Sequence, residues 1–179
     1  MFEEHRLALL LGELFDGFGQ ELQLLIADGA VAGRGVRSDQ QFVQDASQAG
    51  ATEIAASKLA LQRSNNPRIK QFAQQMIADH TKLARNLDVI ASEKGLGAPP
   101  GADAALLGKL QTLQGADFDQ AFVEQVAVGG HRKAVELFQK ESQSGQNEQL
   151  KSAAAHALPV IKHHLAMAQQ LAAATKAAS

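Results

Sequence analysis

Apolar residues recur at steps of three and four along most of the chain, and this spacing predicts amphipathic helices. The runs of alternating β-branched and aromatic residues that are typical of strands are missing from the sequence. The pattern therefore predicts an all-α fold. Long helices are expected at about residues 39–63, 67–94, 117–142 and 148–175, with a short one near residues 104–113.

Two short polar segments are predicted to form turns, each between the two helices of one pair. Ser64–Pro67 offers Asn66 as a helix cap and Pro67 as a first helical residue, and Ser144–Asn147 breaks the second pair. Short turns produce antiparallel hairpins, whereas the long connector at residues 95–117 allows a crossover between them. The sequence therefore predicts a ferritin-like antiparallel four-helix bundle over residues 38–176, with Pro159 kinking the last helix or freeing a carbonyl.

Residues 1–37 are expected to form a separate N-terminal region, with an amphipathic helix at residues 1–27 and a glycine-rich linker after it. The apolar stripe of this helix must be buried against the bundle or against another subunit, which predicts a possible homo-oligomer. Acidic residues at positions 3 and 4 replace the basic start of a secretion signal. The stripe consists of Leu7, Leu11, Leu14, Phe18, Leu22 and Leu25.

Composition excludes several classes of function. Lysine and arginine are scattered and the net charge is −2, so nucleic acid is not an expected partner. No apolar run reaches the roughly 20 residues that span a bilayer, so a transmembrane protein is not expected. The chain has no cysteine, hence no thiolate nucleophile or cysteine-bound zinc. The sequence contains no nucleophile elbow and no glycine-rich phosphate loop. We therefore expect no organic cofactor, and a non-enzymatic function is favoured over an enzymatic one.

One metal-capable residue lies on the apolar stripe of each long helix: Glu53, His80, His131 and His164. With a rise of 1.5 Å per residue, Glu53 lies about 18 Å before the first turn and His80 about 22 Å after it. His131 lies about 22 Å before the second turn and His164 about 28 Å after it. Each pair is therefore separated by about one helical turn, so all four residues can meet inside the bundle.

A buried carboxylate needs a partner because desolvating a bare charge is costly. Three imidazoles with a divalent Zn, Fe, Mn or Cu ion would provide one. The alternative is a hydrogen-bonded Glu–His network without an ion. A di-iron centre is not expected, because the chain contains no Glu-x-x-His. Asp79 is either solvated or a partner of the ligands, and Glu124 is a reserve ligand.

The stretch from Phe42 to Leu171 resembles the bacterial domain of unknown function 4142, whose members are often labelled outer membrane proteins. Glu53, Asp79–His80, His131 and His164 fall at the recurrent polar positions of that family. The resemblance implies a ferritin-like fold and a periplasmic or envelope location, but no settled activity. A cytoplasmic location is the alternative, because the first residues do not resemble an export signal. The matching segments are FVQDASQAGATEIAASKLA, IKQFAQQMIADHTKL, FDQAFVEQVAVGGHRKAVELFQ and LPVIKHHLAMAQQL.

Two functions follow as expectations. The first is a metal-binding domain of the bacterial envelope that uses Glu53, His80, His131 and His164. The second is a non-enzymatic helical module for oligomerisation or partner binding, in which the Glu/His cluster is purely structural.

Overall fold

The computed structural model describes residues 38–96 and 100–176. The chain divides into two units, Met1–Arg37 and Ser38–Ser179, and the described residues all belong to the second. The helix expected at residues 1–27 and its linker therefore lie outside the described residues. Helices make up most of the described part, and no strand occurs in it. The predicted all-α class is confirmed.

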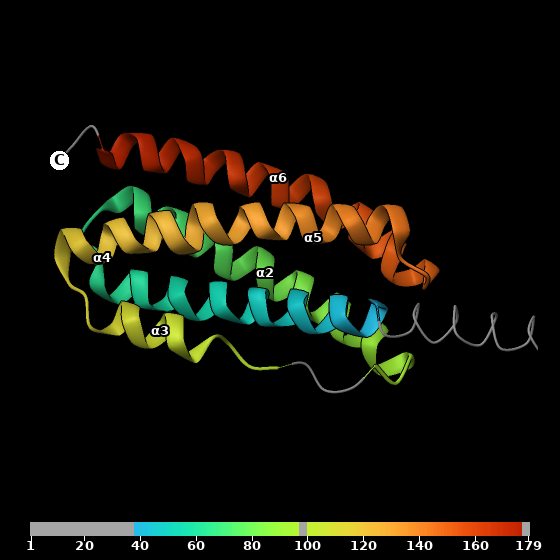
Figure 1. Cartoon of the computed structure of the whole chain (residues 1–179). Helices are drawn as coiled ribbons and strands as arrows, with labels where there is room; N and C mark the ends of the chain where they lie inside the picture. Colours follow the sequence, from blue (N-terminus) through green and yellow to red (C-terminus); the bar gives the residue numbers. More distant parts are fainter. Residues whose placement is uncertain (1–37, 97–99, 177–179) are drawn as a thin grey trace, which may run out of the picture. The chain divides into compact units, whose positions relative to one another are not determined.

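Long helical segments run side by side and form a bundle (Figure 1). The first is the helix of residues 38–63. The second and fourth are α2 (Pro67–Glu93) and α6 (Glu148–Lys176). The third is a continuous rod composed of α4 (Gly115–Ala121), η1 (Phe122–Gly130) and α5 (His131–Ser144).

Short turns join the helices in pairs where the sequence predicts them. The Asn66 side chain accepts a hydrogen bond from the backbone N–H of Arg68 at 3.0 Å, and Pro67 begins α2. Asn147 accepts in the same way from the N–H of Gln149 at 3.0 Å, next to the start of α6. These bonds satisfy N–H groups that have no partner within the first helical turn. Each turn therefore reverses the chain and produces an antiparallel hairpin.

The long connector carries the predicted short helix, α3 (Ala104–Gln111). It runs back along the bundle, so that α2 and the third rod point in the same direction (Figure 1). Asp103 caps α3 by accepting a hydrogen bond from the N–H of Ala105 at 3.0 Å. The N–H of Asp103 itself donates to Thr52 Oγ1 at 2.8 Å. This bond attaches the connector to the helix of residues 38–63.

The third rod contains a feature that the apolar pattern does not predict. It begins at Gly115, and its central part, Phe122–Gly130, is π-helical rather than α-helical. A π-helix has more residues per turn, and such turns are rare and often found at functional sites. Two glycines, Gly129 and Gly130, end the π-helical stretch directly before His131.

Pro159 lies inside α6 without ending it, since the helix continues from Glu148 to Lys176. The proline is exposed, and so is Ala155, whose carbonyl oxygen would have accepted the missing N–H. Water can satisfy that carbonyl on the exposed face. Pro159 therefore frees a carbonyl group on the exposed face of α6 and does not end the helix.

Apart from a small cluster of Ala134, Ala157 and Ile161, the buried apolar side chains form two layers. The aromatic layer, next to the Ser64–Asn66 turn, is built around Phe72, Met76, Leu110, Phe118 and Phe122. The groove layer, toward the opposite end, contains Phe42, Val43, Leu87, Leu150 and Ala154. Within residues 38–96 and 100–176, no helix has a stretch long and apolar enough to cross a bilayer.

Candidate metal centre

Between the two apolar layers lies a polar cluster to which each long helical segment contributes one residue. Glu53 comes from the helix of residues 38–63, His80 from α2, His131 from the start of α5, and His164 from α6. Their exposed fractions are 3%, 5%, 0% and 0%. The four positions that the sequence singled out are thus buried, and the contacts below join them into one cluster.

The three imidazole rings form a nearly equilateral triangle. Ring centroids are 5.4 Å apart for His80–His131, for His80–His164 and for His131–His164. One nitrogen from each ring can be chosen so that all three lie within 4.8 Å of one another. His80 Nε2 and His131 Nε2 are 3.3 Å apart. For zinc, a metal–nitrogen bond is about 2.0–2.1 Å long, so two nitrogens that bind one ion are at most about 4.2 Å apart, and the His80–His131 pair lies within that limit.

Glu53 places its carboxylate beside this triangle. Its Oε2 atom is 3.0 Å from His80 Nε2, and its Oε1 atom is 3.5 Å from His131 Nδ1. Oε1 is buried and has no hydrogen-bond partner. Gly130 makes this position available, because a Cβ atom on that residue would stand 2.9 Å from Oε1. The glycine before His131 therefore leaves the space that the Glu53 side chain occupies.

Burial raises the pKa of Glu53, but the neighbouring histidines, His80 first, outweigh it and leave the pKa below its ordinary value. Glu53 is therefore ionised at neutral pH. Burial lowers the pKa of His131 and of His164 more than the nearby carboxylates raise it. Both rings are consequently neutral at pH 7. The buried cluster therefore combines an ionised carboxylate with at least two neutral imidazoles.

The hydrogen bond of His131 to the backbone fixes its tautomer. Its Nδ1 atom lies 2.8 Å from the carbonyl oxygen of Ala127, which can only accept. Nδ1 therefore carries the proton, and Nε2 keeps a free lone pair. The Nε2 atom of His80 lies close to both this lone pair and the Glu53 carboxylate, so one N–H can be shared between the two acceptors.

Asp79 orients His164 in the same manner. The Nε2 atom of His164 donates to Asp79 Oδ2 at 2.9 Å, and Asp79 also accepts from Gln75 Nε2 at 2.9 Å. The other ring nitrogen, Nδ1, is buried and has no hydrogen-bond partner. Of the two roles that the sequence left open for Asp79, the structure shows the partner of a histidine. A histidine held by a carboxylate through its second nitrogen is the usual arrangement around protein-bound metals.

The donor set fits a cation. Buried polar atoms normally have partners, and Glu53 Oε1 and His164 Nδ1 are two acceptors that lack one. Neutral imidazole nitrogen together with carboxylate oxygen is a combination that Zn, Fe and Cu accept. A positive ion held by the three imidazoles would satisfy His164 Nδ1 and offset the charge of the neighbouring Glu53 carboxylate.

Other residues from the sequence analysis lie apart from this cluster. Glu124, the reserve ligand, is exposed, and its nearest polar contact is with Gln120. His156 and His163 are also exposed. Gly130 was not predicted to belong to the site. Its signal was present, since paired glycines are unusual inside a helix and these two directly precede a candidate ligand.

Comparisons with solved structures show a shared fold. A DUF305 protein of Streptomyces coelicolor, described as secreted, matches with a TM-score of 0.66 and 15% identity, over 78% of this chain and 92% of that one. A DUF305 fragment from Deinococcus radiodurans gives a TM-score of 0.66 and 16% identity, over 76% and 95%. CopM in its Cu(II)-bound form gives 0.63 and 18%, over 75% and 95%. These likenesses establish the helical-bundle fold, and a specifically ferritin-like relationship stays a prediction.

The sequence comparison agrees with the resemblance noted from the motifs. Among curated proteins, none matches significantly. Residues 27–171 match the family described as a domain of unknown function, DUF4142, and this span includes all four residues of the polar cluster. Because the match covers most of the chain, the protein belongs to the DUF4142 family.

Proposed function

We propose that this domain binds one metal ion inside the bundle, with Glu53, His80, His131 and His164 as ligands. The observation that carries the proposal is the pair of buried acceptors without partners, Glu53 Oε1 and His164 Nδ1, beside the free lone pair of His131. The cost of burying such groups is offset when they coordinate a cation. Because the ligands must be neutral imidazoles and an ionised carboxylate, protons compete with the metal, and binding weakens as the pH falls.

The donor chemistry narrows the choice of ion. Three imidazoles and a carboxylate suit Cu(II) and Zn(II), while Cu(I) and Ag(I) favour sulfur ligands. CopM, which shares the fold, has been solved with Cu(I), Cu(II) and Ag bound, and this supports copper as the first probe. Four protein ligands would fill a tetrahedral shell. The proposed role is therefore binding or storage of the ion, without catalysis.

The decisive experiment is metal titration of the metal-stripped protein by calorimetry, with elemental analysis of the natively purified protein. We expect one Cu(II) or Zn(II) per chain and a rise in unfolding free energy of about 2.7 kcal/mol when the free ion is at 100 times its Kd. The double variant His131→Ala/His164→Ala should lose both effects. The matched control is His156→Ala/His163→Ala, which removes two exposed histidines and should bind as the wild type does.

Failure to fold would make the histidine variants uninformative, so their helicity is checked by circular dichroism and Asp79→Ala is tested beside them. Asp79 is partly exposed and does not coordinate the ion in this proposal, but it holds the His164 ring. Its loss should weaken metal affinity by about 10- to 100-fold. Wild-type protein that takes up no Zn, Cu, Mn or Fe and keeps the same stability in their presence would refute the proposal. That result would favour the alternative of a purely structural cluster in an interaction module.

We further propose that the protein works outside the cytoplasm. The similar DUF305 protein of Streptomyces coelicolor is described as secreted, and the DUF4142 resemblance implies an envelope location. Fractionation of cells that express the full-length native gene tests this. Recovery with the periplasmic or envelope fraction is expected, and recovery with the cytosol would contradict it.

A further inference from the structure

Because all four proposed ligands are buried, an ion needs a route from solvent to the cluster. Two hollows on the bundle reach it, and both are lined by Glu53. The first is a groove of about 750 Å³ that also reaches His80; most of its lining residues are apolar, and Glu148, Ser152 and His156 are among the polar ones. The second is a cleft of about 510 Å³ between the helix of residues 38–63 and the η1–α5 rod.

The cleft has a polar lining. Its wall on the helix of residues 38–63 includes Gln48 and Thr52, and the start of α3 contributes Asp103. The opposite wall includes Gln125 on η1 and the charged residues of α5, Lys133, Glu136 and Lys140. Polar and charged residues make up a larger share of the cleft lining than of the groove lining, so a hydrated cation keeps more of its solvation along the cleft.

The unpartnered oxygen of the cluster lies at the inner end of the cleft. Gly130 lines this cleft, and a Cβ atom there would stand 2.9 Å from Glu53 Oε1. The other oxygen, Oε2, is already engaged with His80 Nε2 at 3.0 Å. Oε1 is thus the buried acceptor of Glu53 that is not yet bonded, and it is adjacent to the side-chain-free position of the wall.

We propose that the metal ion enters and leaves through the polar cleft, with Glu53 Oε1 as the first atom of the site that it meets. This inference rests on the proposed function, since it concerns the route to the same site. Glu53, whose Oε1 atom fills the space left by the absent side chain of Gly130, links the cleft to the three imidazoles. The apolar groove is not part of the route.

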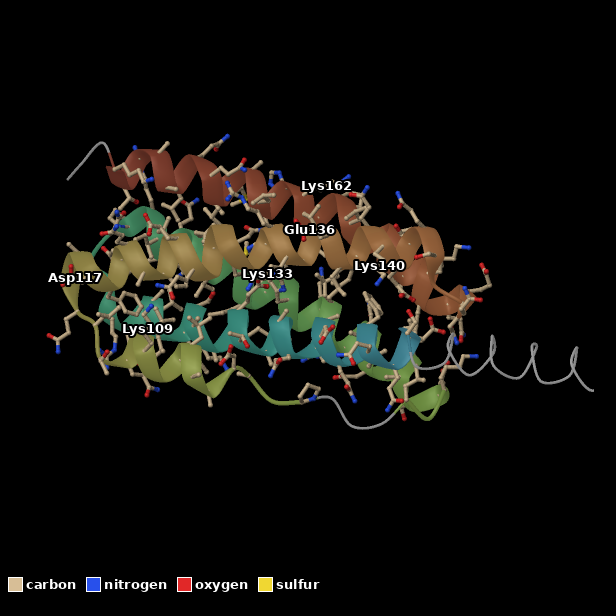
Figure 2. The ribbon with its side chains drawn as sticks, in the orientation of Figure 1. Lys109, Asp117, Lys133, Glu136, Lys140 and Lys162 are labelled. Atoms are coloured by element: carbon tan, nitrogen blue, oxygen red, sulfur yellow. The ribbon has the colours of Figure 1, made fainter. Side chains whose placement is uncertain are left out.

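Two lysines at the mouth of the cleft provide a test. Lys133 and Lys140 are exposed along α5, with Glu136 near them, whereas Lys162 lies on α6 (Figure 2). Positive charge beside an entry path slows the approach of a cation, and removing it accelerates association at low salt. Lys133→Gln/Lys140→Gln should therefore load Cu(II) or Zn(II) about two- to tenfold faster than the wild type at low ionic strength. The difference should shrink at 0.5 M salt because of screening.

The matched control is Lys82→Gln/Lys162→Gln. It makes the same change in net charge, on exposed residues two positions from His80 and from His164, but neither lysine lines the cleft. Loading is followed by stopped-flow competition with a chromophoric chelator on the metal-free full chain. The control pair should load at the wild-type rate. Equal acceleration by both pairs, or no acceleration by the cleft pair, would overturn the route.

Obstruction gives a second readout. Ala153→Leu adds bulk to the groove, and the proposal expects an unchanged loading rate. Gly130→Ala would place a methyl group 2.9 Å from Glu53 Oε1, so it should displace this proposed ligand, slow loading and weaken affinity, whereas Gly50→Ala, whose new methyl group has open space around it, should change neither. Slower loading in Ala153→Leu would assign the route to the groove. Equilibrium titration separates the two ideas: a protein that binds no metal refutes the proposed function, while normal affinity with unaltered rates refutes only the route.

Discussion

The two apolar layers on either side of the histidine cluster are built by the same four helical segments, yet they differ in how completely they are filled. In the aromatic layer, Phe118 and Phe122 are fully buried and their rings stack with centroids 6.1 Å apart. The short helix α3 contributes Leu110, also fully buried, to the same layer. In the groove layer, α6 presents Ala153, Ala154 and Ala157, and the groove opens there.

The difference follows from side-chain volume. Alanines on α6 cannot fill the space that phenylalanines fill at the other end. Val89 and Val160, the large apolar side chains most exposed among the described residues, both line this groove. Close packing supplies much of the stability of a domain, and gaps reduce the van der Waals contacts that atoms make. We infer that the aromatic layer stabilises the bundle and that the groove layer is its adaptable end.

Truncating one phenylalanine in each layer should give the largest contrast. Phe122→Ala leaves an enclosed cavity and should lower the unfolding free energy by about 3–5 kcal/mol. Phe42 is 3% exposed and lines the groove, so its removal enlarges a space that solvent already reaches. Phe42→Ala should therefore lower the unfolding free energy only by the free energy of transferring the side chain to water, about 1.5–3 kcal/mol. Urea unfolding of the metal-free proteins measures both, and equal losses would contradict the comparison.

Adding volume should have opposite effects in the two layers. Ala73 is fully buried in the aromatic layer, so Ala73→Leu forces its neighbours apart and should cost about 1–3 kcal/mol. Ala153→Leu places the same side chain in the groove and should raise stability by up to about 1 kcal/mol through added burial. Thermal unfolding compares the two variants. Destabilisation by both would mean that the groove layer is as tightly packed as the aromatic one.

Much of the fold follows from local signals in the sequence. The helices begin and end near the predicted residues because Asn66, Pro67 and Asn147 act through short-range bonds that one segment determines by itself. The convergence of Glu53 with His80 could be estimated from helical rise alone, since a short turn fixes the relative height of two helices. The relative height of His131 and His164 could be estimated in the same way.

Other features depend on contacts that a single sequence does not specify. The π-helical stretch before His131 changes which face each residue presents, and apolar spacing does not reveal it. The role of Asp79 depended on which side of α2 faces α6, so the sequence left two options open. The groove depends on the summed volume of the side chains that four helical segments place at the same level of the bundle. The apolar stripe of a single helix does not reveal that sum. Glu141 is also buried, and the apolar stripes do not indicate this.

Buried carboxyl groups are a further difference between the two ends of the bundle. Asp39 and Glu141 both lie at the groove end, where the helix of residues 38–63 begins and α5 ends. The Asp39 carboxylate accepts a hydrogen bond from the N–H of Gln146 at 3.1 Å, while Glu141 Oε1 is buried without a partner. Burial, and next the charge of Asp39, raise the pKa of Glu141 from 4.5 to about 7. The folded state therefore holds a proton that the unfolded chain releases at lower pH. Stability from this group is complete below pH 4.5 and is lost as the pH rises toward 7 and beyond.

Glu141→Gln should remove this pH dependence. The variant keeps the shape of the protonated side chain, so it should match the wild type near pH 4 and exceed its unfolding free energy by up to about 3 kcal/mol at pH 8. Glu136→Gln, an exposed change of the same kind on the same helix, should shift the curve little at either pH. The measurement is chemical unfolding of metal-free protein from pH 4 to 8. The histidine cluster acts in the opposite direction: the lowered pKa values of His131 and His164 destabilise the folded state as the pH falls below about 6.5. A variant curve that runs parallel to the wild type across the whole range would show that Glu141 is not strained by its burial, and the groove end would then differ from the aromatic end in packing alone.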